Sequence, residues 1–323
     1  MTRRDVVLVV ADATDPTADR VCAVLAARAA RFFRFDTADV PQRLRLRAEL
    51  GTTSWHGELV SAEDRVDLDE VGAVYVRRPR AFEPPAHLSA IEQWHAAIEC
   101  RYALGGILAS LGGVRWCNMP AHSADAAYKP KQLRDFRACG LATPPTVITN
   151  DAQVVREFAE QVGVVICKPV AVGVVRTGGG TQVVYTRRVS AQELKHLTGV
   201  DYSAHLFQAY VEALFSVRLT VVGNRFFAVR IDAGSDRARI DWRSDYAALS
   251  CRVIDTPPDI RAGVAAYLKM AGLAFGAFDF GVSTEGWWAY ECNAEGQVGW
   301  LEAETGIPIS EAIADFLLGE HEP

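Results

Sequence analysis

One short stretch near the C-terminus combines residue types that can bind a cation. Residues 287–300 read W-W-A-Y-E-C-N-A-E-G-Q-V-G-W, in which Glu291 and Asn293 alternate with Tyr290 and Cys292. Alternate residues of a β-strand share a face, so the carboxylate and the carboxamide are expected on one side and Tyr290 and Cys292 on the other. Either the polar pair lies on a wet face, or it holds something that needs oxygen ligands.

A third oxygen ligand comes from the preceding segment of the chain. Asp279 is separated from Glu291 by the turn sequence S-T-E-G. A three-residue loop T-E-G pairs Ser283 with Trp287, which places Asp279 opposite Glu291 and one step from Asn293. Such a trio suits Mg²⁺, which is commonly shared between carboxylates and substrate phosphates. A solvated hairpin face is the alternative, and the aromatic residues around it disfavour that alternative.

Two lysines and a glycine-rich loop could face such a metal site. Lys168 ends the apolar segment V-V-I-C-K, where a charge is costly unless an anion pairs with it. Lys129 begins a predicted helix. The glycines of T-G-G-G-T (Gly178, Gly179 and Gly180) leave backbone N–H groups free to line an anion, although a mobile hairpin tip explains them equally well. No G-K-[ST] follows, so this is not a Walker A loop.

Further candidates lie between this loop and Asp279. The short segment F-Q-A-Y-V could present the alternating backbone donor and acceptor that an adenine edge needs; its residues are Gln208, Ala209, Tyr210 and Val211. Arg218 and Arg230 lie on adjoining predicted strands, and the rigid arginine fork suits phosphate or carboxylate. Singly, each arginine is more often a surface residue. Together with the lysines and the carboxylates, they resemble a polyphosphate–metal site.

Composition narrows the class of protein. The chain has 323 residues, a formal net charge of −6 and half of its residues hydrophobic, which is typical of a globular protein. The acidic balance argues against bulk attraction to nucleic acid or to an anionic membrane. The seven cysteines form no C-x-x-C pair, the histidines show no metal-ligand spacing, and no export signal or membrane span is recognisable. We therefore expect a cytoplasmic protein.

The order of predicted elements indicates several lobes. Residues 5–10 read as a buried strand followed by an amphipathic helix, but the turn between them lacks the glycines that a dinucleotide-binding fold needs. Helices are predicted over 87–111 and 128–139, the latter ending at Gly140. A strand then leads to Asn150 or Asp151 as the next helix cap. After about residue 163 strands with tight turns predominate, so α/β units precede an antiparallel α+β region.

Taken in order, these motifs resemble the ATP-grasp enzymes. Within that fold, the chain is similar to the ribosomal-peptide maturases that make microviridins and other graspetides. The likeness runs through Y-V-R-R-P, K-P-K-Q-L, G-L-A-T-P-P-T-V-I-T-N, F-Q-A-Y-V, V-R-L-T-V-V-G, I-D-W-R and E-C-N-A-E-G-Q-V-G-W-L-E, and it is weakest in residues 1–70 and 80–115. One departure is E-A-L-F-S-V-R, since such enzymes usually carry a lysine and an acidic residue before this arginine.

The resemblance implies an α/β (α+β) fold with three lobes. They are an N-terminal pre-ATP-grasp lobe (1–115), a central ATP-grasp lobe (116–200) and a C-terminal ATP-grasp lobe (201–323), with ATP between the last two. Lys129 and Lys168 would bind the nucleotide phosphates, the glycine loop would close over them, and residues 208–211 would hold adenine. Two Mg²⁺ ions would be bound by Asp279, Glu291 and Asn293.

The implied reaction is an ATP-dependent carboxylate–amine or carboxylate–hydroxyl ligation through an acyl phosphate. Lys168, Arg218 and Arg230 are the candidates for stabilising the transferred phosphoryl group or the tetrahedral intermediate. Donor and acceptor would be side chains of one ribosomal precursor peptide, recruited by its leader and joined into ester or amide macrocycles. Peptide contacts are expected near Asp245 and at four residues: Arg77, Arg78, Asp241 and Arg243. Exposed charge on loops is the more frequent explanation for such residues.

Two rival functions remain open. An ATP-grasp ligase that acts on free amino acids or on a protein tail, as glutathione-synthetase-like and glutamate-adding enzymes do, would keep the same ATP site. A non-catalytic nucleotide-binding protein need not keep both lysines and all three metal ligands. Recruitment of a leader peptide separates the first rival from the maturase. Similar enzymes are often homodimers, although the sequence itself indicates no interface.

Overall fold

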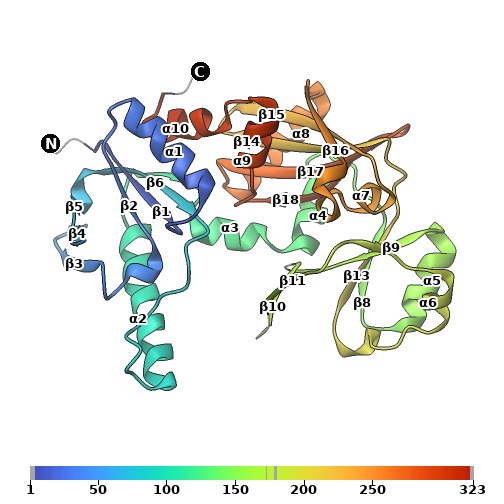
Figure 1. Cartoon of the computed structure of the whole chain (residues 1–323), viewed down its shortest axis with the longest axis horizontal. Coiled ribbons are helices and arrows are strands. Elements are labelled where there is room, and N and C mark those ends of the chain that lie inside the picture. The colour runs from blue at the N-terminus through green and yellow to red at the C-terminus, as the bar shows by residue number, and fades with distance from the viewer. Residues whose placement is uncertain (1–3, 172, 178–179, 321–323) are drawn as a thin grey trace.

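The computed structural model describes residues 4–171, 173–177 and 180–320. Two four-stranded sheets and one five-stranded sheet form the cores of three lobes (Figure 1). The N-terminal lobe lies at one end of the molecule, and the C-terminal sheet lies between it and the central lobe. No helix of the described residues has both the length and the hydropathy that a membrane crossing requires.

A parallel sheet forms the core of the N-terminal lobe. Its elements are β1 (Val6–Ala11), α1 (Pro16–Ala27), β2 (Phe32–Phe35), β6 (Val71–Arg77) and β7 (Arg115–Cys117), with the strands in the order β2-β1-β6-β7. Every residue of β1 is buried, as its continuous apolar run predicts. Helix α1 begins after Asp15, whose carboxylate accepts hydrogen bonds from the backbone N–H groups of Thr17 and Ala18.

A small antiparallel sheet and a long helix complete this lobe. They are β3 (Arg45–Leu50), β4 (Trp55–Val60), β5 (Arg65–Asp67) and α2 (Ala90–Ala109). Ser89 caps α2 and forms a capping box with Glu92, in agreement with the helix predicted over 87–111. The small sheet has no clear signal in the sequence, because its strands carry only two buried apolar side chains, Leu59 and Val66.

The central lobe is an antiparallel sheet reached through two helices. Helices α3 (Pro120–Ala126) and α4 (Lys129–Ala138) precede β8 (Thr146–Thr149), α5 (Ala152–Val162), β9 (Val165–Lys168), β12 (Arg187–Arg188), α6 (Ala191–Lys195) and β13 (His205–Ala209). The strand order is β12-β9-β13-β8. Lys129 and Pro130 occupy the first turn of α4, where the missing N–H of proline costs nothing. Asp151 is the N-cap of α5.

The one described glycine of the predicted loop, Gly180, belongs to a separate two-stranded ribbon. Strands β10 (Val174–Thr177) and β11 (Gly180–Val183) pair antiparallel, with Thr177 opposite Gly180. Figure 1 shows this ribbon extending from the central lobe into the middle of the molecule. Gly178 and Gly179 lie outside the described residues, whereas Gly180 begins β11.

The C-terminal lobe is a five-stranded antiparallel sheet in the order β16-β15-β14-β17-β18. Its elements are β14 (Phe215–Val222), β15 (Arg225–Ala233), α7 (Asp236–Ile240), β16 (Leu249–Ile254), α8 (Pro258–Ala271), β17 (Phe275–Ser283), β18 (Gly286–Asn293), α9 (Gly299–Thr305) and α10 (Ile309–Leu318). Buried residues of α4 and α8, such as Phe136 and Tyr267, pack on one face of the sheet around Phe278. On the other face, α1, α9 and α10 cover one end, next to Ala277 and Val229. The remaining part of that second face carries the polar site.

The proposed lobe boundaries can be refined from the sheets. Strand β13 (His205–Ala209) pairs with β8 and β9 of the central sheet, beyond the boundary proposed at residue 200. Strand β7 likewise belongs to the N-terminal sheet and ends just after residue 115. We therefore propose boundaries near residues 118 and 210.

Candidate functional site

The β17–β18 hairpin brings the three predicted metal ligands to one face of the sheet. Asp279 pairs with Glu291, and Asn293 pairs with Ala277. Residues that are directly opposite each other in a ladder project to the same side of the sheet, so the two carboxylates and the carboxamide converge. The predicted register between Asp279 and Glu291 is confirmed.

The hairpin reaches this register by a path that differs from the predicted one. Ser283 pairs with Gly286 across a two-residue turn, so the predicted pairing with Trp287 is wrong. The register then shifts next to Asp279, where Tyr290 is the extra residue of a β-bulge. The shorter turn and the extra residue cancel each other, because each moves the register by one position.

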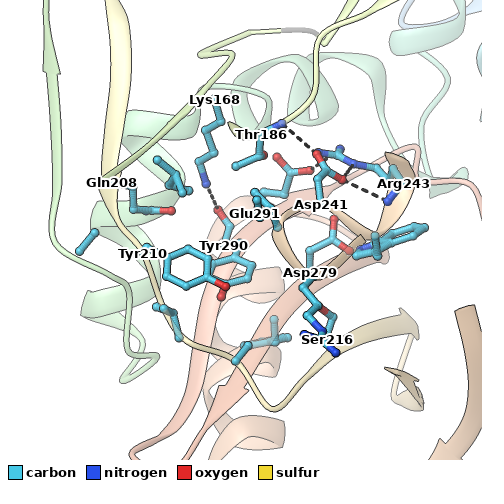
Figure 2. A pocket seen from close by; sticks show the side chains of 18 residues that line it. Lys168, Thr186, Gln208, Tyr210, Ser216, Asp241, Arg243, Asp279, Tyr290 and Glu291 are labelled. Atoms are coloured by element: carbon cyan, nitrogen blue, oxygen red, sulfur yellow. Dashed lines mark hydrogen bonds and ion pairs between the residues drawn. The ribbon is translucent and has the colours of Figure 1, made fainter. Parts of the chain in front are cut away.

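The bulge also changes the face on which Tyr290 lies. The prediction that Tyr290 and Cys292 share a face is wrong: Cys292 is buried in the core, whereas Tyr290 lines the same pocket as Glu291 (Figure 2). Tyr290 lies over Gly281, where a Cβ atom would come within 2.0 Å of the tyrosine hydroxyl. Only glycine at this position leaves room for the ring.

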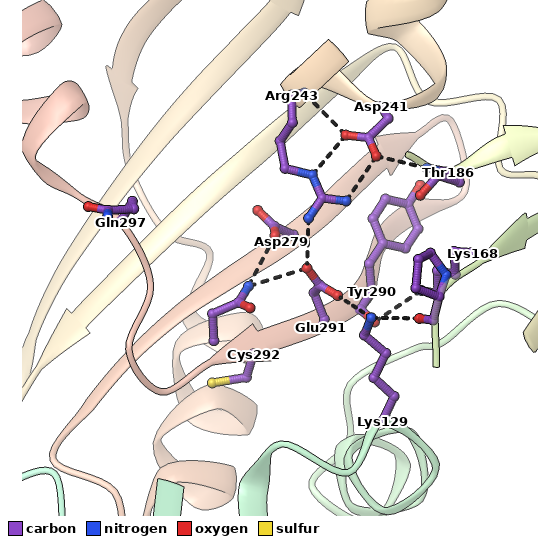
Figure 3. A network of polar contacts seen from close by, with 12 residues as sticks. Lys129, Lys168, Thr186, Asp241, Arg243, Asp279, Tyr290, Glu291, Cys292 and Gln297 are labelled. Atoms are coloured by element: carbon purple, nitrogen blue, oxygen red, sulfur yellow. Dashed lines mark hydrogen bonds and ion pairs between the residues drawn. The ribbon is translucent and has the colours of Figure 1, made fainter. Parts of the chain in front are cut away.

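Glu291 is the centre of a charge network that joins elements of the central and C-terminal lobes (Figure 3). Its Oε2 lies 3.3 Å from Lys129 Nζ, and its Oε1 lies 3.4 Å from an Arg243 nitrogen. Asn293 Nδ2 donates to Glu291 at 3.3 Å and to Asp279 at 3.4 Å. Burial raises the pKa of Glu291, but Lys129, Arg243 and Lys168 outweigh it and hold the pKa at about 2. Glu291 is therefore ionised at neutral pH.

Asp279 is held differently from Glu291. Arg218, which is its partner across β14 and β17, donates to Asp279 Oδ2 at 2.9 Å. Burial raises the pKa of Asp279, the charge of Glu291 adds to this effect, and Arg218 and Arg243 oppose it. Two carboxylates this close together favour a cation between them.

The oxygen atoms available here fit Mg²⁺. Asp279 Oδ1 is buried and has no hydrogen-bond partner in the described chain, although such an atom is costly to leave unsatisfied. A half-turn of the Asn293 amide would direct its oxygen, instead of its nitrogen, toward the carboxylates. Among the described residues no group of three or more His, Cys, Asp or Glu side chains suited to a metal occurs, so further oxygen ligands beside the two carboxylates would come from an amide, water or phosphate. Hard oxygen ligands of this kind favour Mg²⁺ over zinc.

The two predicted lysines approach this group from the central lobe. Lys129 Nζ donates to the carbonyl oxygen atoms of Pro169, at 2.8 Å, and Ala171, at 3.3 Å, in addition to its ion pair with Glu291. Lys168 Nζ lies 3.4 Å from the carbonyl oxygen of Tyr290. Burial lowers the pKa of Lys168 to about 8, and Glu291 only partly offsets this effect. A bound anion would relieve the cost of burying this charge.

The predicted adenine segment lines a pocket that opens between the central and C-terminal sheets (Figure 2). Lining residues include Lys168, Gln208, Ala209, Tyr210, Val211, Arg243, Asp279, Tyr290 and Glu291. The side chain of Gln208 is fully buried, and its Nε2 donates to Thr146 Oγ1 at 2.7 Å. Within the described chain the N–H of Val211 donates no backbone hydrogen bond, whereas that of Tyr210 donates to Val164. Val211 therefore has a donor free for a ligand in this pocket.

Asp241 and Arg243, predicted as peptide contacts, belong to the charge network. Arg243 donates through two nitrogens to the carboxylate of Asp241, at 2.9 Å each, and contacts Glu291 with a third nitrogen. Asp241 is buried and also accepts a hydrogen bond from the Thr186 N–H at 3.0 Å. Burial opposes the charge on Arg243, but Asp241 and Glu291 raise its pKa above its ordinary value. Asp241 thus orients Arg243 toward Glu291.

The structure does not bring Arg230 to this group. Arg230 pairs with Val217, one position away from Arg218, so its side chain projects from the opposite face of the sheet. There it binds Asp232 and lies 3.9 Å from the ring centre of Phe215. Arg218 meets the carboxylates, and Arg230 does not.

Arg77 and Arg78 are adjacent in the chain, but their side chains have different surroundings. Only 2% of Arg77 is exposed, and its guanidinium faces residues 295–297, so a peptide contact is not supported for it. Arg78 has a left-handed backbone (φ 44°) and donates to the carbonyl oxygen of Glu295 at 3.2 Å. Arg78 lines a second cavity of about 490 Å³, together with Lys129, Asn293, Arg243 and Glu291.

Sequence reasoning missed a residue that anchors the ligand strand. Gln132, three residues after Lys129 on α4, donates to the carbonyl oxygen of Cys292 at 2.8 Å and accepts from its N–H at 2.9 Å. The side chain is buried. A glutamine on the apolar face of a predicted amphipathic helix is a signal that could have identified it, because a buried amide needs partners.

The chain is similar to known ATP-grasp proteins in sequence and in fold. Residues 6–124 match the family model of the MvdD pre-ATP grasp domain. A ribosomal-peptide-associated ATP-grasp ligase from Chryseobacterium gregarium, solved with ADP and with a leader and core peptide, is 25% identical, with a TM-score of 0.89 and 98% of each chain covered. No curated protein sequence matches the chain significantly.

Two macrocyclases from Microcystis aeruginosa MRC are similar over almost the whole chain. MdnC, solved with the precursor peptide MdnA, is 27% identical, with a TM-score of 0.84 and coverage of 98% of this chain and 100% of MdnC. MdnB is 28% identical, with a TM-score of 0.79 and coverage of 97% of this chain and 99% of MdnB. The predicted ATP-grasp fold and the resemblance to ribosomal-peptide ligases are both confirmed.

Proposed function

We propose that this chain, which is an ATP-grasp ligase, joins side chains of a ribosomal precursor peptide by ester or amide bonds. One observation carries the proposal: the pocket that contains the adenine segment and the second cavity share Glu291 and Arg243. A phosphate donor on one side and a peptide side chain on the other would therefore meet at the carboxylates. The similar ligase from Chryseobacterium gregarium has been solved with ADP and with a leader and core peptide.

The first pocket would bind ATP. Val211 would donate its free N–H to the adenine edge, and Lys168 and Lys129 would neutralise the phosphates. Asp279, Glu291 and Asn293 would hold Mg²⁺, which when bound neutralises phosphate charge during transfer. The β10–β11 ribbon would close over the phosphates and exclude water, which would otherwise hydrolyse the activated acyl group.

The chemistry requires two successive displacements. A carboxylate oxygen of an Asp or Glu side chain attacks the γ-phosphorus of ATP, and ADP leaves. A Ser or Thr hydroxyl or a Lys amine then attacks the acyl carbon and loses a proton, and phosphate leaves. Lys129 and Arg243 lie beside Glu291, where both steps develop negative charge. Arg218 would act through Asp279.

The second cavity would hold the peptide. Arg78 at its wall is the candidate for a peptide carboxylate, because it is an exposed residue whose one hydrogen bond within the described chain is from Nε to the carbonyl oxygen of Glu295. Asp241 would act through Arg243, and neither would need to contact the peptide. The catalytic role suggested for Arg230 stays a prediction, as do a second Mg²⁺ ion, a homodimer and a cytoplasmic location.

The direct test is mass spectrometry of a precursor peptide. Purified protein, ATP and Mg²⁺ would be incubated with the Thr-, Glu- and Asp-rich peptide encoded beside its gene, with ATP omitted as the control. We expect the loss of one water per link, dependent on ATP. Release of ADP with free amino acids, without any change in the peptide, would favour a ligase of small molecules. If neither peptide nor amino acids promote ADP release, the protein is a nucleotide binder and the proposal fails.

A further inference from the structure

The loop that leaves the ligand strand is held by the N-terminal lobe. Residues 294–298 connect Asn293 to α9, so their position bears on the position of that ligand. Asn118, just after β7, donates to the carbonyl oxygen of Ala294 at 3.0 Å. Arg77, at the end of β6, binds the next three residues. Both anchors come from the N-terminal sheet or its end, and none of the described residues of that sheet lines the pocket proposed for ATP.

Arg77 is a buried cation whose donors are directed at this loop. One terminal nitrogen donates to the carbonyl oxygens of Glu295 and Gly296, the latter at 3.0 Å, and the other donates to Gln297 Oε1 at 2.7 Å. Its Nε lies 3.4 Å from a carboxylate oxygen of Asp15, the residue that caps α1. Burying an arginine costs several kcal/mol unless good partners offset the cost. Both terminal nitrogens of the Arg77 guanidinium therefore bind residues 295–297.

The same loop touches the second arginine of the site. The carbonyl oxygen of Gln297 lies 3.5 Å from a terminal nitrogen of Arg218, whose other nitrogen binds Asp279. A Cβ atom at Gly296 would come within 2.6 Å of Arg218, so the loop lies directly against this side chain. A continuous series of contacts therefore runs from Arg77 through residues 296–297 and Arg218 to Asp279.

We propose that Arg77 is a positioning residue through which the N-terminal lobe sets the affinity of the Asp279–Glu291–Asn293 site for a divalent cation. The inference rests on the proposed function, since it takes these residues as the metal site. Metal ligands must be held within about 0.5 Å of their productive geometry, and residues behind the ligands supply that precision. Gln297 links the two arginines: its side-chain oxygen accepts a hydrogen bond from Arg77, and its backbone carbonyl oxygen faces Arg218.

The test compares metal affinity with fold stability. Mn²⁺ would be titrated into the protein–ADP complex and followed by electron paramagnetic resonance, for wild type, Arg77→Lys, Gln297→Leu and the double variant. We expect each single variant to weaken Mn²⁺ binding about 10- to 100-fold, as is typical for residues behind metal ligands. The losses of Mn²⁺ affinity should not add in the double variant, because both changes remove the hydrogen bond between Arg77 and Gln297. Gln297→Leu keeps the buried cation, so it carries the test if Arg77→Lys does not fold.

Arg80→Lys is the matched control. Arg80 lies three residues from Arg77 and binds Asp36, within the N-terminal lobe. This change should lower the melting temperature without altering Mn²⁺ affinity. Unchanged Mn²⁺ affinity in Arg77→Lys and Gln297→Leu, with lower melting temperatures, would overturn the positioning role and leave the metal site intact. Failure of the wild-type protein to bind Mn²⁺ with ADP would instead overturn the metal site itself, and the inference with it.

Discussion

The two pockets that meet at Glu291 are lined by different kinds of structure. Half of the residues that line the pocket proposed for ATP lie on strands, among them Lys168 at the end of β9, Gln208 on β13 and Asp279 on β17. The second cavity takes only Glu291, Cys292 and Asn293 from a strand, and the rest of its lining comes from helices α3 and α4 and from connecting segments, among them Arg78 after β6 and Glu295 after β18. Strand residues are fixed by ladder hydrogen bonds on both sides, whereas connecting segments are free to vary.

This difference separates shared chemistry from choice of substrate. Phosphoryl transfer requires the same placement of charge whichever peptide is modified, so a rigid sheet suits the ATP side. Recognition of a particular peptide requires a surface that can change between relatives without moving the carboxylates, and loops supply it. The comparison predicts that substitutions in the ATP pocket change nucleotide binding and that substitutions in the second cavity change KM for the peptide. Only substitutions of residues shared by both pockets should affect both substrates and turnover.

The largest effect is expected at the shared residue. Glu291→Gln removes the negative charge that holds Lys129, Arg243 and the proposed cation together, while the side chain keeps nearly the same shape. Metal-ion stabilisation of transferred phosphoryl charge amounts to several kcal/mol, so turnover should fall by about 10³-fold or more. Peptide cyclisation followed by mass spectrometry measures this change.

The matched control for this substitution lies on the same hairpin. Glu285 is exposed at the β17–β18 turn, and Glu285→Gln should leave turnover unchanged. Asn293→Ala keeps both carboxylates and should also lose turnover, so it serves if Glu291→Gln melts at a much lower temperature than wild type. Turnover at the wild-type rate in Asn293→Ala and in a folded Glu291→Gln would refute the metal assignment.

Local pattern predicts the strand-based part of this molecule well. The register of Asp279 against Glu291 followed from turn chemistry, and the start of α4 at Lys129 followed from proline. The predicted turn was nevertheless wrong, because a two-residue turn together with a bulge at Tyr290 gives the same strand register at Asp279 as a three-residue loop. The spacing between Asp279 and Glu291 depends only on the total number of residues between them, so sequence spacing cannot distinguish a three-residue loop from a shorter turn with a bulge.

Long-range placement is what sequence alone could not supply. Arg230 and Arg218 look equivalent on adjoining strands, but the register of β14 with β15 sends them to opposite faces. Arg77 and Arg78 are neighbours, yet one is buried against the loop after β18 and the other borders a cavity. In each pair, the distinction depends on contacts between segments far apart in the chain, which composition and periodicity do not encode.

A smaller effect, confined to one side, is expected in the second cavity. Arg78→Ala removes an exposed guanidinium from the cavity wall, and a charged hydrogen bond of about 1.4 kcal/mol corresponds to a tenfold change. We expect KM for the peptide to rise about tenfold, with KM for ATP unchanged. Arg47→Ala, on exposed strand β3, controls for the loss of one positive charge. A rise in KM for ATP instead would mean that the two pockets are not functionally separate.

The smallest effect is a pH dependence confined to the ATP side. Burial lowers the pKa of Lys168 to about 8, so its ammonium is present below pH 8 and is lost as the pH rises above it. Affinity for ADP should therefore fall above pH 8, by at most about tenfold per pH unit, because one proton is taken up on binding. Lys168→Arg should remove this dependence, since a guanidinium stays protonated throughout. Calorimetric titration of ADP at several pH values measures both.

The same lysine should act on stability with the opposite sign. Between about pH 8 and its ordinary pKa of 10.5, Lys168 is neutral in the folded protein and protonated in the unfolded chain. The unfolded chain then binds more protons, so the contribution of Lys168 to the free energy of unfolding rises with pH in that range. Denaturant unfolding of wild type against Lys168→Met, without nucleotide, isolates this contribution. Deprotonation of the buried Lys168 should weaken nucleotide binding and, at the same time, remove the cost of burying its charge in the folded protein. If nucleotide affinity and the contribution to the free energy of unfolding both fell above pH 8, Lys168 would therefore not be the titrating group.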